Sequence, residues 1–322
     1  GAVHEGINLQ FDGERHRVPM TELTGRAITV YGQQEVVKDL VAARLAAGGD
    51  VRFEVDGVRL DGLAADRPVI RFRHGGREQE VRCDFVAGCD GFHGVCRDAV
   101  PAGVLRTYQR DYPFAWLGVL ARAAPAIDEL IYCNHLAGFA LYSLRSPEVS
   151  RLYLQVPPDE DIAGWSDRRI WDELHHRLEI GGDWAVTEGP VLEKGVTPMR
   201  SFVVEPMQWR RLYLAGDAVH IVPPTGAKGM NLALADVRLL GQGIAAWYAE
   251  GSTGLLDAYS ATALRRVWRA QHFSWWMTSM LHRFADHDPY QEKLQLSQLR
   301  YVVTSRAYAT SLAENYVGLP TV

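Results

Sequence analysis

Residues 212 to 231, LYLAGDAVHIVPPTGAKGMN, constrain the fold more than any other stretch of this chain. Leu212 to Ala215 have the pattern of a short buried strand, and apolar residues recur at helical spacing from Met230 onward. Asp217 therefore falls where a strand ends and a loop begins, which is where open α/β folds bind ligands. The helix that follows has glycines and no capping side chain before it, so its free N–H groups favour an anionic ligand atom. The alternative is an ordinary connection between a strand and a helix.

Length and charge narrow the class of protein. The chain has 322 residues, of which 47% are hydrophobic and 23% are charged, so it can form a large core or two domains. Its formal net charge of -5 makes nucleic acid and an anionic membrane poor partners. No apolar run approaches the roughly 20 residues that cross a bilayer. We therefore expect a cytoplasmic protein that binds neither nucleic acid nor membrane.

The cysteines argue against a metal site. Cys83, Cys89, Cys96 and Cys133 form no CxxC pair and have no histidine at zinc-finger spacing. We predict no metal ligands and expect the thiols to be buried and reduced.

The first half of the chain has the pattern of an α/β layer followed by a β-sheet. Strand-like runs alternate with one helical stretch, at residues 28–31, 51–55, 69–72 and, for the helix, 34–47. The run 81–91 is predicted to be a strand that ends in Asp90 and glycine, much as the strand of the opening stretch ends at Gly-Asp. Residues 92–100 can then open a helix. Aromatic and β-branched runs from Phe114 to Val156 then predict an antiparallel sheet inserted between the two Asp turns.

Helices dominate the second half. Ser166 is a candidate N-cap for a helix at 167–180, and strand character returns from 191 to 207. Beyond that point the pattern predicts only helices after the opening stretch, at residues 229–250, 255–284 and 289–315. Because we find no repeat and no low-complexity linker, we expect two lobes that are interwoven in sequence.

Polar side chains are predicted to share one face of the antiparallel sheet. Ser143 and Arg145 are two residues apart, and Arg151 and Tyr153 have the same spacing on the next run. A guanidinium, a hydroxyl and a phenol on one face can bind a carboxylate. The alternative is a solvated face on which the arginines are surface charge.

Together these stretches resemble the flavoprotein aromatic hydroxylases. The Gly-Asp stretch alone indicates flavin hydroxylases in general, and the other segments narrow the likeness. They run from one end of the chain to the other: VHEG at 3–6, VYGQ at 30–33, AGCDGFHG at 87–94, ELIYCNH at 129–135, SLRS at 143–146, LAGDAVHIVPPTGAKGMNLA at 214–233, FSWWMTS at 273–279 and AENYVGLP at 313–320.

The resemblance implies an α/β fold, an activity and an assembly. A mixed βαβ domain for FAD would be interwoven with an antiparallel-sheet domain for the substrate, followed by C-terminal helices. The FAD domain would take residues 1–112 and 205–250, the substrate domain 113–204, and a helical interface region 251–322. The implied reaction converts 4-hydroxybenzoate to 3,4-dihydroxybenzoate with NADPH or NADH and O2, through a flavin hydroperoxide. The implied assembly is a homodimer.

Transferred position by position, the resemblance also assigns cofactor contacts. Asp217 would hold the ribityl chain of FAD, and Gln33 would make another contact. The backbone around Met230 and Asn231 would face the pyrimidine edge of the flavin, with Lys228 nearby.

Three further residues are assigned to the movement and reduction of the flavin. Arg151 would contact the flavin and couple its movement to substrate binding. His93 and Arg200 would contact the nicotinamide nucleotide. Taken alone, His93 is an ordinary histidine.

The implied substrate site has a carboxylate end and a phenol end. Ser143, Arg145 and Tyr153 would bind the carboxylate. At the other end, a relay would remove the phenol proton, because the ring must be electron-rich to accept oxygen. The residues assigned to the ring and the relay are Pro224 beside the ring, Tyr132 on the phenol, Tyr316 next, and His4 near solvent. The alternative for the two tyrosines is a core aromatic residue with a satisfied hydroxyl.

The chain departs from the family at its start. The family begins with a strand, a GxGxxG turn and a helix, and GCDGFHG differs from that motif in spacing and position. We therefore expect the N-terminal unit of the FAD domain to be missing from this chain. Two other hypotheses stay open: a hydroxylase of a related hydroxybenzoate, and a non-catalytic fragment that binds an aromatic acid.

Overall fold

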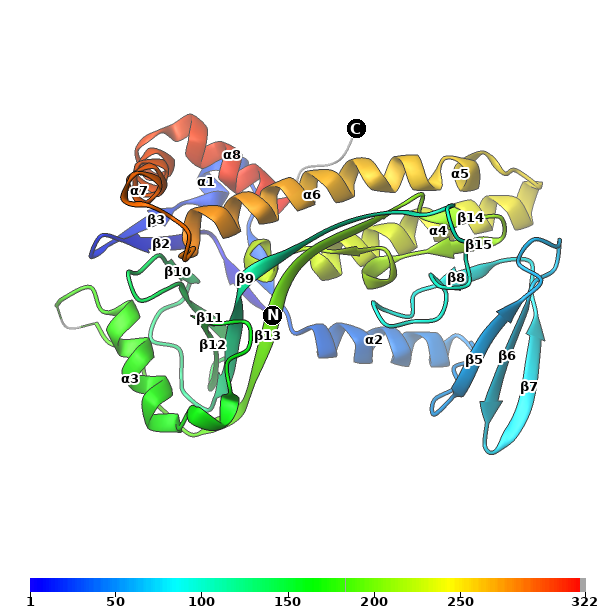
Figure 1. The fold of residues 1–322 in the computed structure, drawn as a ribbon, viewed down its shortest axis with the longest axis horizontal. Helices are drawn as coiled ribbons and strands as arrows, with labels where there is room; N and C mark the ends of the chain where they lie inside the picture. Colours follow the sequence, from blue (N-terminus) through cyan, green and yellow to red (C-terminus); the bar gives the residue numbers. More distant parts are fainter. Residues whose placement is uncertain (183, 319–322) are drawn as a thin grey trace.

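Two long antiparallel strands organise the molecule. The computed structural model describes residues 1–182 and 184–318, so the last two residues of the AENYVGLP stretch lie outside the described residues. Strands β9 (Arg106–Ala121) and β13 (Val191–Glu205) pair along their length. They extend from one part of the molecule to the part that carries β15 (Leu212–Leu214) (Figure 1). The chain crosses between the two parts along these strands, which confirms the expected interwoven arrangement.

An eight-stranded sheet forms the wider part of the molecule. Its order is β16-β13-β9-β12-β11-β10-β2-β3, and all neighbours are antiparallel except β10 and β2. The predicted antiparallel sheet is confirmed, and two strands from the start of the chain extend it. The bounds of the other members are β2 (Ile7–Phe11), β3 (Glu14–Val18), β10 (Ile131–Cys133), β11 (Ala140–Ser146), β12 (Val149–Val156) and β16 (His220–Ile221).

Both faces of this sheet are buried, because side chains alternate between two cores. On β9, Leu117 and Val119 pack toward α3 (Asp167–Leu178), whereas Phe114 and Trp116 pack toward the C-terminal helices. The Ser166 hydroxyl accepts a hydrogen bond from the backbone N–H of Arg169 at 3.2 Å, which confirms the predicted cap of α3. The candidate site lies on the face that the C-terminal helices cover.

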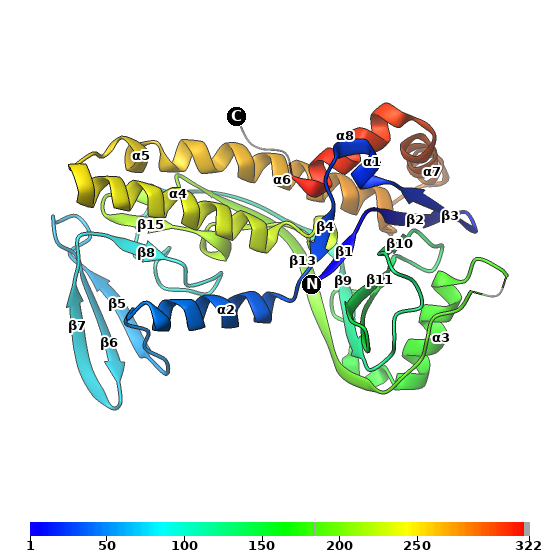
Figure 2. The same cartoon turned by 180° about the vertical axis from the view of Figure 1, so that it is seen from behind.

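A smaller parallel pair carries the opening stretch. Strands β8 (Val86–Gly88) and β15 lie parallel, with β14 (Gln208–Trp209) on the other side of β15. Helix α2 (Gln33–Ala46) lies below this pair in both views, and α4 (Gly229–Glu250) lies above α2. Strands β5, β6 and β7 form a separate meander beyond the end of α2 (Figure 2). The remaining strands are β1 (Ala2–His4), β4 (Ile28–Val30), β5 (Asp56–Asp61), β6 (Val69–His74) and β7 (Arg77–Arg82).

The helices follow the predicted order. Short 3-10 turns are η1 (Ile162–Gly164), η2 (Gly216–Ala218) and η3 (Pro224–Gly226). Within the described residues, no helix combines the length and hydropathy needed to cross a membrane. The α-helices besides α3 are α1 (Met20–Thr24), α2 (Gln33–Ala46), α4 (Gly229–Glu250), α5 (Gly254–Asp257), α6 (Tyr259–Leu281), α7 (Pro289–Thr304) and α8 (Arg306–Val317).

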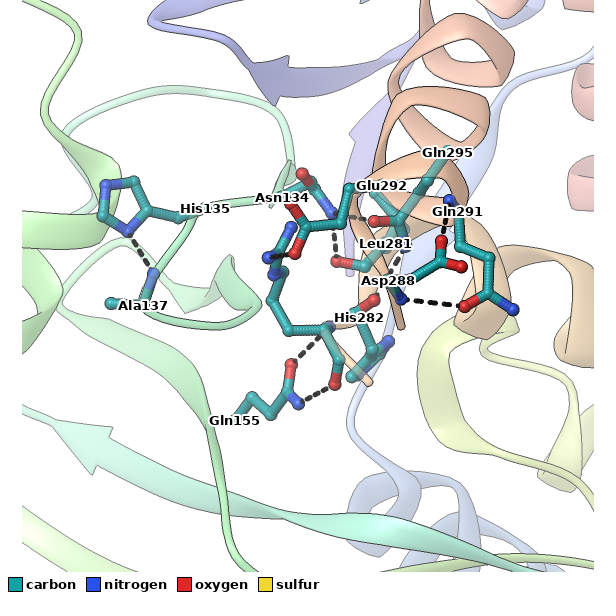
Figure 3. Close-up of polar contacts among 11 residues, drawn as sticks. Asn134, His135, Ala137, Gln155, Leu281, His282, Asp288, Gln291, Glu292 and Gln295 are labelled. Carbon is teal, nitrogen blue, oxygen red and sulfur yellow. Dashed lines mark hydrogen bonds and ion pairs between the residues drawn. The ribbon is translucent and has the colours of Figure 1, made fainter. Parts of the chain in front are cut away.

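Side-chain amides cap the C-terminus of α6 (Figure 3). Gln295 Nε2 donates to the carbonyls of Ser279 and His282 at 2.8 and 2.7 Å, and Asn134 Nδ2 donates to that of Leu281 at 3.0 Å. These bonds satisfy carbonyls that have no partner inside the helix. They also fix the end of α6 to the sheet and to α7.

The same polar network holds the segment after α6 (Figure 3). Gln155 Nε2 donates to the carbonyl of Arg283 at 2.6 Å, while its Oε1 accepts from the backbone N–H groups of Arg283 and Phe139, each at 3.0 Å. One amide on β12 thus serves three backbone groups.

Three predicted elements are wrong in detail. Residues 51–55 form no strand, because Glu54 has a left-handed backbone (φ 57°), and the strand there is β5. Residues 92–100 form turns rather than a helix, and the Asp90 carboxylate accepts a hydrogen bond from the N–H of Cys96 within its own loop. The run 81–91 is split between the end of β7 and β8.

The two long C-terminal helices are each divided. The expected helix at 255–284 separates into α5 and α6 at Ala258, and the one at 289–315 separates into α7 and α8 at Ser305. Ser305 has an extended backbone and its hydroxyl caps α8. The expectation for the thiols holds for Cys96 and Cys133, but Cys89 is exposed.

Candidate active site

A cleft of about 400 Å³ lies where the parallel strands β8 and β15 end. Residues from three distant segments line it, including Gln33 on α2, Asp217 in η2 and Met230 on α4. The structure therefore brings together three of the residues predicted to contact the cofactor. Its apolar wall consists of Val36, Val37 and Leu40 from α2 and Ala233, Leu234 and Val237 from α4.

The N-terminus of α4 opens into this cleft without a side-chain cap. Lys228 occupies the N-cap position and accepts no capping hydrogen bond, so the first N–H groups of the helix stay available to a ligand. Gly216 has φ 63°, and a Cβ at this position would lie 3.2 Å from the Cβ of Ala233. Glycine therefore allows the strand end to approach the helix closely.

A buried, hydrogen-bonded histidine and aspartate join these two elements. Asp236 Oδ2 on α4 lies 2.5 Å from His220 Nε2 and accepts the backbone N–H of Gly216 at 3.1 Å, and both side chains are almost fully buried. The pair fixes the turn that carries Asp217 against α4. Sequence reasoning missed this pair, although a signal was present. The buried positions of α4 are Leu232, Asp236, Leu240 and Gly243, so an acid lies in an otherwise apolar stripe.

These groups fit the flavin and ribityl part of FAD. Planar rings suit the apolar wall, and the exposed carboxylate of Asp217 can accept hydrogen bonds from sugar hydroxyls. The free N–H groups of α4 favour negative charge on the ligand.

The predicted substrate residues share one face of the large sheet. In register, Tyr132 lies opposite Leu141, Leu141 opposite Tyr153, and Tyr153 opposite Gly118. Ser143 lies opposite Arg151 on the same face, so the predicted common facing is confirmed. Gly118 makes room for the phenol, since a Cβ there would lie 3.2 Å from the ring of Tyr153.

The arginines of this face point to different partners. The Arg145 guanidinium donates to the Gln34 side chain at the start of α2, while the Ser143 hydroxyl donates to the Leu144 carbonyl at 3.4 Å. The structure therefore places Arg145 at the side of the face rather than against Ser143. Arg151 lies over the ring of Tyr153, 5.3 Å from its centroid, and its Nε is buried without a hydrogen bond among the described residues.

Two buried tyrosine hydroxyls, one of them on this face, are hydrogen-bonded to each other. The Tyr132 and Tyr316 hydroxyl oxygens lie 2.5 Å apart. Burial raises the pKa of Tyr132 well above its usual value and that of Tyr316 to about 12, so both are neutral near pH 7. The link joins β10 to α8, which the sequence alone does not place together.

His4 is buried on β1 with neither ring nitrogen hydrogen-bonded within the described part of the chain. Burial lowers the pKa of its imidazole, with nearby Glu129 and Asp128 opposing that effect. A neutral imidazole with free nitrogens can take part in a water-bridged chain, but the structure shows no direct bond to Tyr316.

Lys228 and Asn231 lie on another side of α4 from the cleft, and Pro224 is exposed in η3. The Lys228 ammonium donates to the backbone carbonyl of Tyr316. Burial, and to a lesser extent the charge of Arg269, lowers the pKa of Lys228 to about 8. Lys228 therefore contacts the backbone of Tyr316, one member of the hydroxyl pair.

The two residues predicted to contact the nicotinamide nucleotide are brought together. His93 packs edge-on against Phe92, with centroids 5.0 Å apart, and the Arg200 guanidinium lies 4.9 Å over the same ring. His93 lies in the loop after β8, and Arg200 lies on β13.

Comparison with known proteins agrees with this site. The family model described as "FAD binding domain" matches residues 1–274. The chain is 47% identical to the p-hydroxybenzoate hydroxylase of Acinetobacter baylyi over 321 residues, which is 99% of this chain and 79% of that protein. It is 29% identical to the rifampicin monooxygenase of Streptomyces venezuelae over 238 residues, covering 71% of this chain and 47% of that one.

Solved structures share the fold. The p-nitrophenol 4-monooxygenase PnpA from Pseudomonas putida has a TM-score of 0.81 at 16% identity and covers 99% of this chain and 82% of its own. The anhydrotetracycline hydroxylase OxyS from Streptomyces rimosus has a TM-score of 0.70 at 21% identity, covering 94% of this chain, which spans only 60% of OxyS. The family match and the 47% identity show that this chain belongs to the FAD-binding flavoprotein aromatic hydroxylases.

Proposed function

We propose that this chain acts as an FAD-dependent monooxygenase that converts 4-hydroxybenzoate to 3,4-dihydroxybenzoate with NADPH or NADH and O2. The observation that carries the proposal is the Tyr132–Tyr316 hydroxyl pair, buried on the same sheet face as Ser143, Arg151 and Tyr153. The name of the 47% identical relative supports the same substrate.

The phenol relay would activate the substrate ring. The Tyr132 hydroxyl accepts the proton of the substrate phenol and passes its own to Tyr316, which lies within hydrogen-bond distance. Burial keeps both tyrosines neutral, so each can accept one proton and give up another. His4, also neutral, is the proposed outlet toward solvent. When bound, FAD supplies the oxygen-activating chemistry, and the protein supplies binding, orientation and proton transfer.

The carboxylate of the substrate would bind at the other end of the face. Arg145 reaches it by exchanging Gln34 for the ligand, and Ser143 and Tyr153 add hydroxyl donors. Pro224 would lie beside the ring. Arg145 thus provides the positive charge, and Ser143 and Tyr153 orient the carboxylate.

The remaining assignments are also proposals. FAD would lie in the cleft at Gln33, Asp217 and Met230, with Asn231 and Lys228 at the helix start and Arg151 between flavin and substrate. His93 and Arg200 would contact the nicotinamide nucleotide. We further propose a cytoplasmic homodimer with the domain division at 1–112, 113–204, 205–250 and 251–322.

The test is substrate-stimulated NAD(P)H oxidation by the chain reconstituted with FAD. We expect 4-hydroxybenzoate to accelerate oxidation and 3,4-dihydroxybenzoate to accumulate. Arg145→Gln should raise the KM for 4-hydroxybenzoate by roughly 100-fold, because a charge-assisted bidentate contact is lost. Arg122→Gln, an exposed arginine just after β9, is the matched control.

Other hydroxybenzoates separate this proposal from its nearest alternative. If a related hydroxybenzoate is hydroxylated with a higher kcat/KM, the substrate assignment is wrong while the reaction class stands. If flavin binds but no hydroxybenzoate stimulates oxidation, the enzyme proposal for this chain is wrong.

A further inference from the structure

A second cavity, of about 320 Å³, lies on the other side of the first two turns of α4 from the flavin cleft. Residues of α4, α6 and the end of α8 line it, so three helices converge on it. None of the assigned substrate contacts faces it, and only Lys228 and Asn231 among the assigned cofactor contacts do.

The charged side chains that line this cavity are all cationic. They are Lys228 on the cavity's inner side and Arg266 and Arg269 on α6, and no aspartate or glutamate is among the described lining residues. The Lys228 ammonium donates to the Tyr316 carbonyl, and Arg269 Nε donates to Asn315 Oδ1 at 3.2 Å. Both cations thus donate to neutral oxygens and not to a carboxylate, and this arrangement favours an anionic ligand in the cavity.

The rest of the wall is apolar. Leu232, Ala270 and Phe273 are buried there, and Lys228 Nζ lies 5.4 Å from the centroid of the Phe273 ring. The volume exceeds what a bare inorganic anion fills and is too small for a dinucleotide, whereas one aromatic ring with a carboxylate fits. Ring-sized apolar walls with cations at one side are the chemistry that recognises an aromatic acid.

We propose that this cavity is a second binding site for a small aromatic carboxylate. The proposal rests on the proposed function, because the same class of compound occupies the first site at Tyr132 and Arg145. A carboxylate here lies beside the ammonium that holds the backbone of Tyr316. Occupancy of the second site is thereby connected to the phenol relay.

The experiment is a titration of the FAD-reconstituted chain with 4-fluorobenzoate, followed by 19F NMR and calorimetry. The compound carries a carboxylate and a ring but no phenol, so it binds without being turned over. We expect two bound resonances and a stoichiometry of two molecules per chain. Arg145→Gln should remove one binding event and leave the other. The double variant Arg266→Gln/Arg269→Gln should weaken the second event by about tenfold or more and leave the first unchanged.

Arg265→Gln is the matched control, since Arg265 lies on the same helix, is exposed and does not line the cavity. A single binding event that depends on Arg145 and is unaffected by the double variant would overturn the proposal. So would a second event that the double variant leaves intact. AMP tests whether a nucleotide phosphate is the occupant instead. The proposal would also be overturned if AMP binding depended on Arg266 and Arg269 and 4-fluorobenzoate binding did not. If the unaltered chain shows the event that depends on Arg266 and Arg269 but none that depends on Arg145, the result would instead contradict the proposed function.

Discussion

At the scale of single residues, the proposed chemistry depends on groups whose pKa the fold has shifted. Tyr132, Tyr316 and Lys228 were all singled out from the sequence, but their pKa shifts follow from burial that no motif contains. Burial disfavours the charged form of each, so the phenols stay protonated and the ammonium loses its proton more readily.

Tyr316→Phe tests the phenol relay. The change removes the hydroxyl 2.5 Å from Tyr132 and leaves the ring in the core. We expect the hydroxylation rate near pH 7 to fall by roughly 100-fold, because general acid–base help of that order is lost, with little change in the Kd of 4-hydroxybenzoate. Rapid-reaction product analysis gives the rate. Tyr308→Phe, on the same helix, is the control, and a full rate for Tyr316→Phe would exclude the relay.

Lys228→Met tests the burial of the ammonium. The folded pKa of about 8 lies below the ordinary 10.5, so the unfolded chain binds more protons between these values and stability rises with pH there. Below pH 8 the full penalty is present. We expect Lys228→Met to be more stable at pH 7 by on the order of 1–2 kcal/mol, after discounting for partial exposure, and the gain to vanish toward pH 10.5.

Denaturant unfolding without added FAD measures this difference. Lys38→Met, an exposed lysine on α2, should show no such pH dependence. A constant gain for Lys228→Met at every pH would mean that packing, and not charge, is responsible.

At the scale of elements, polar side chains decide how helices meet strands. Asp236 and His220 attach α4 to the turn after β15, and Gln155 and Gln295 attach the end of α6 to the sheet and to α7. Helical periodicity predicted α4 and α6 themselves, because it depends on neighbouring residues. These attachments join residues far apart in the chain, so periodicity carries no information about them.

Asp236→Asn tests the attachment of α4. The substitution keeps the volume but leaves His220 and the Gly216 N–H without their shared carboxylate. We expect a loss of about 2–4 kcal/mol in the free energy of unfolding and roughly tenfold weaker FAD binding, since the turn with Asp217 is released. Flavin fluorescence titration measures the affinity. Asp257→Asn, an exposed acid on α5, is the control, and unchanged FAD affinity would show that the pair is only structural.

Gln155→Leu tests the attachment of α6. It leaves two N–H groups and one carbonyl without their hydrogen bonds. We expect a cost of about 3 kcal/mol, measured by urea unfolding, because each unsatisfied buried group costs roughly 1–3 kcal/mol and some recover water. Gln242→Leu, exposed on α4, should change the free energy of unfolding by less than about 0.5 kcal/mol. A similar small effect for Gln155→Leu would contradict this account of the cap.

At the scale of the whole molecule, two long strands join the proposed flavin cleft to the proposed substrate face. The cleft is lined by α2, the ends of β8 and β15, and α4. A ligand there therefore contacts segments that lie before and after the substrate-side strands in the sequence. The chain spans 79% of the p-hydroxybenzoate hydroxylase it matches, and Gln33, Asp217 and Met230, which line this cleft, are the proposed flavin and ribityl contacts.

FAD should therefore stabilise the whole chain. At a free concentration of about 100 Kd, binding adds about 2.7 kcal/mol, which corresponds to roughly 4 °C in Tm for a chain of this size. Thermal unfolding with and without FAD measures the shift, and riboflavin at the same concentration compares the ring and ribityl contacts alone. No shift with either ligand would show that the cleft does not bind the flavin.

The sequence by itself determined the strand, Gly-Asp turn and helix of the opening stretch, the antiparallel sheet and the common facing of Ser143, Arg151 and Tyr153. Each of these follows from spacing within a few residues or from strand alternation, and strand alternation is a local property. The resemblance implied that Tyr132 meets Tyr316, and local patterns did not. Only the tertiary structure decided that Asp236 holds the turn of Asp217 and that Arg145 lies against α2. Those contacts form because distant elements share a core, and burial then sets the charge of the groups inside it.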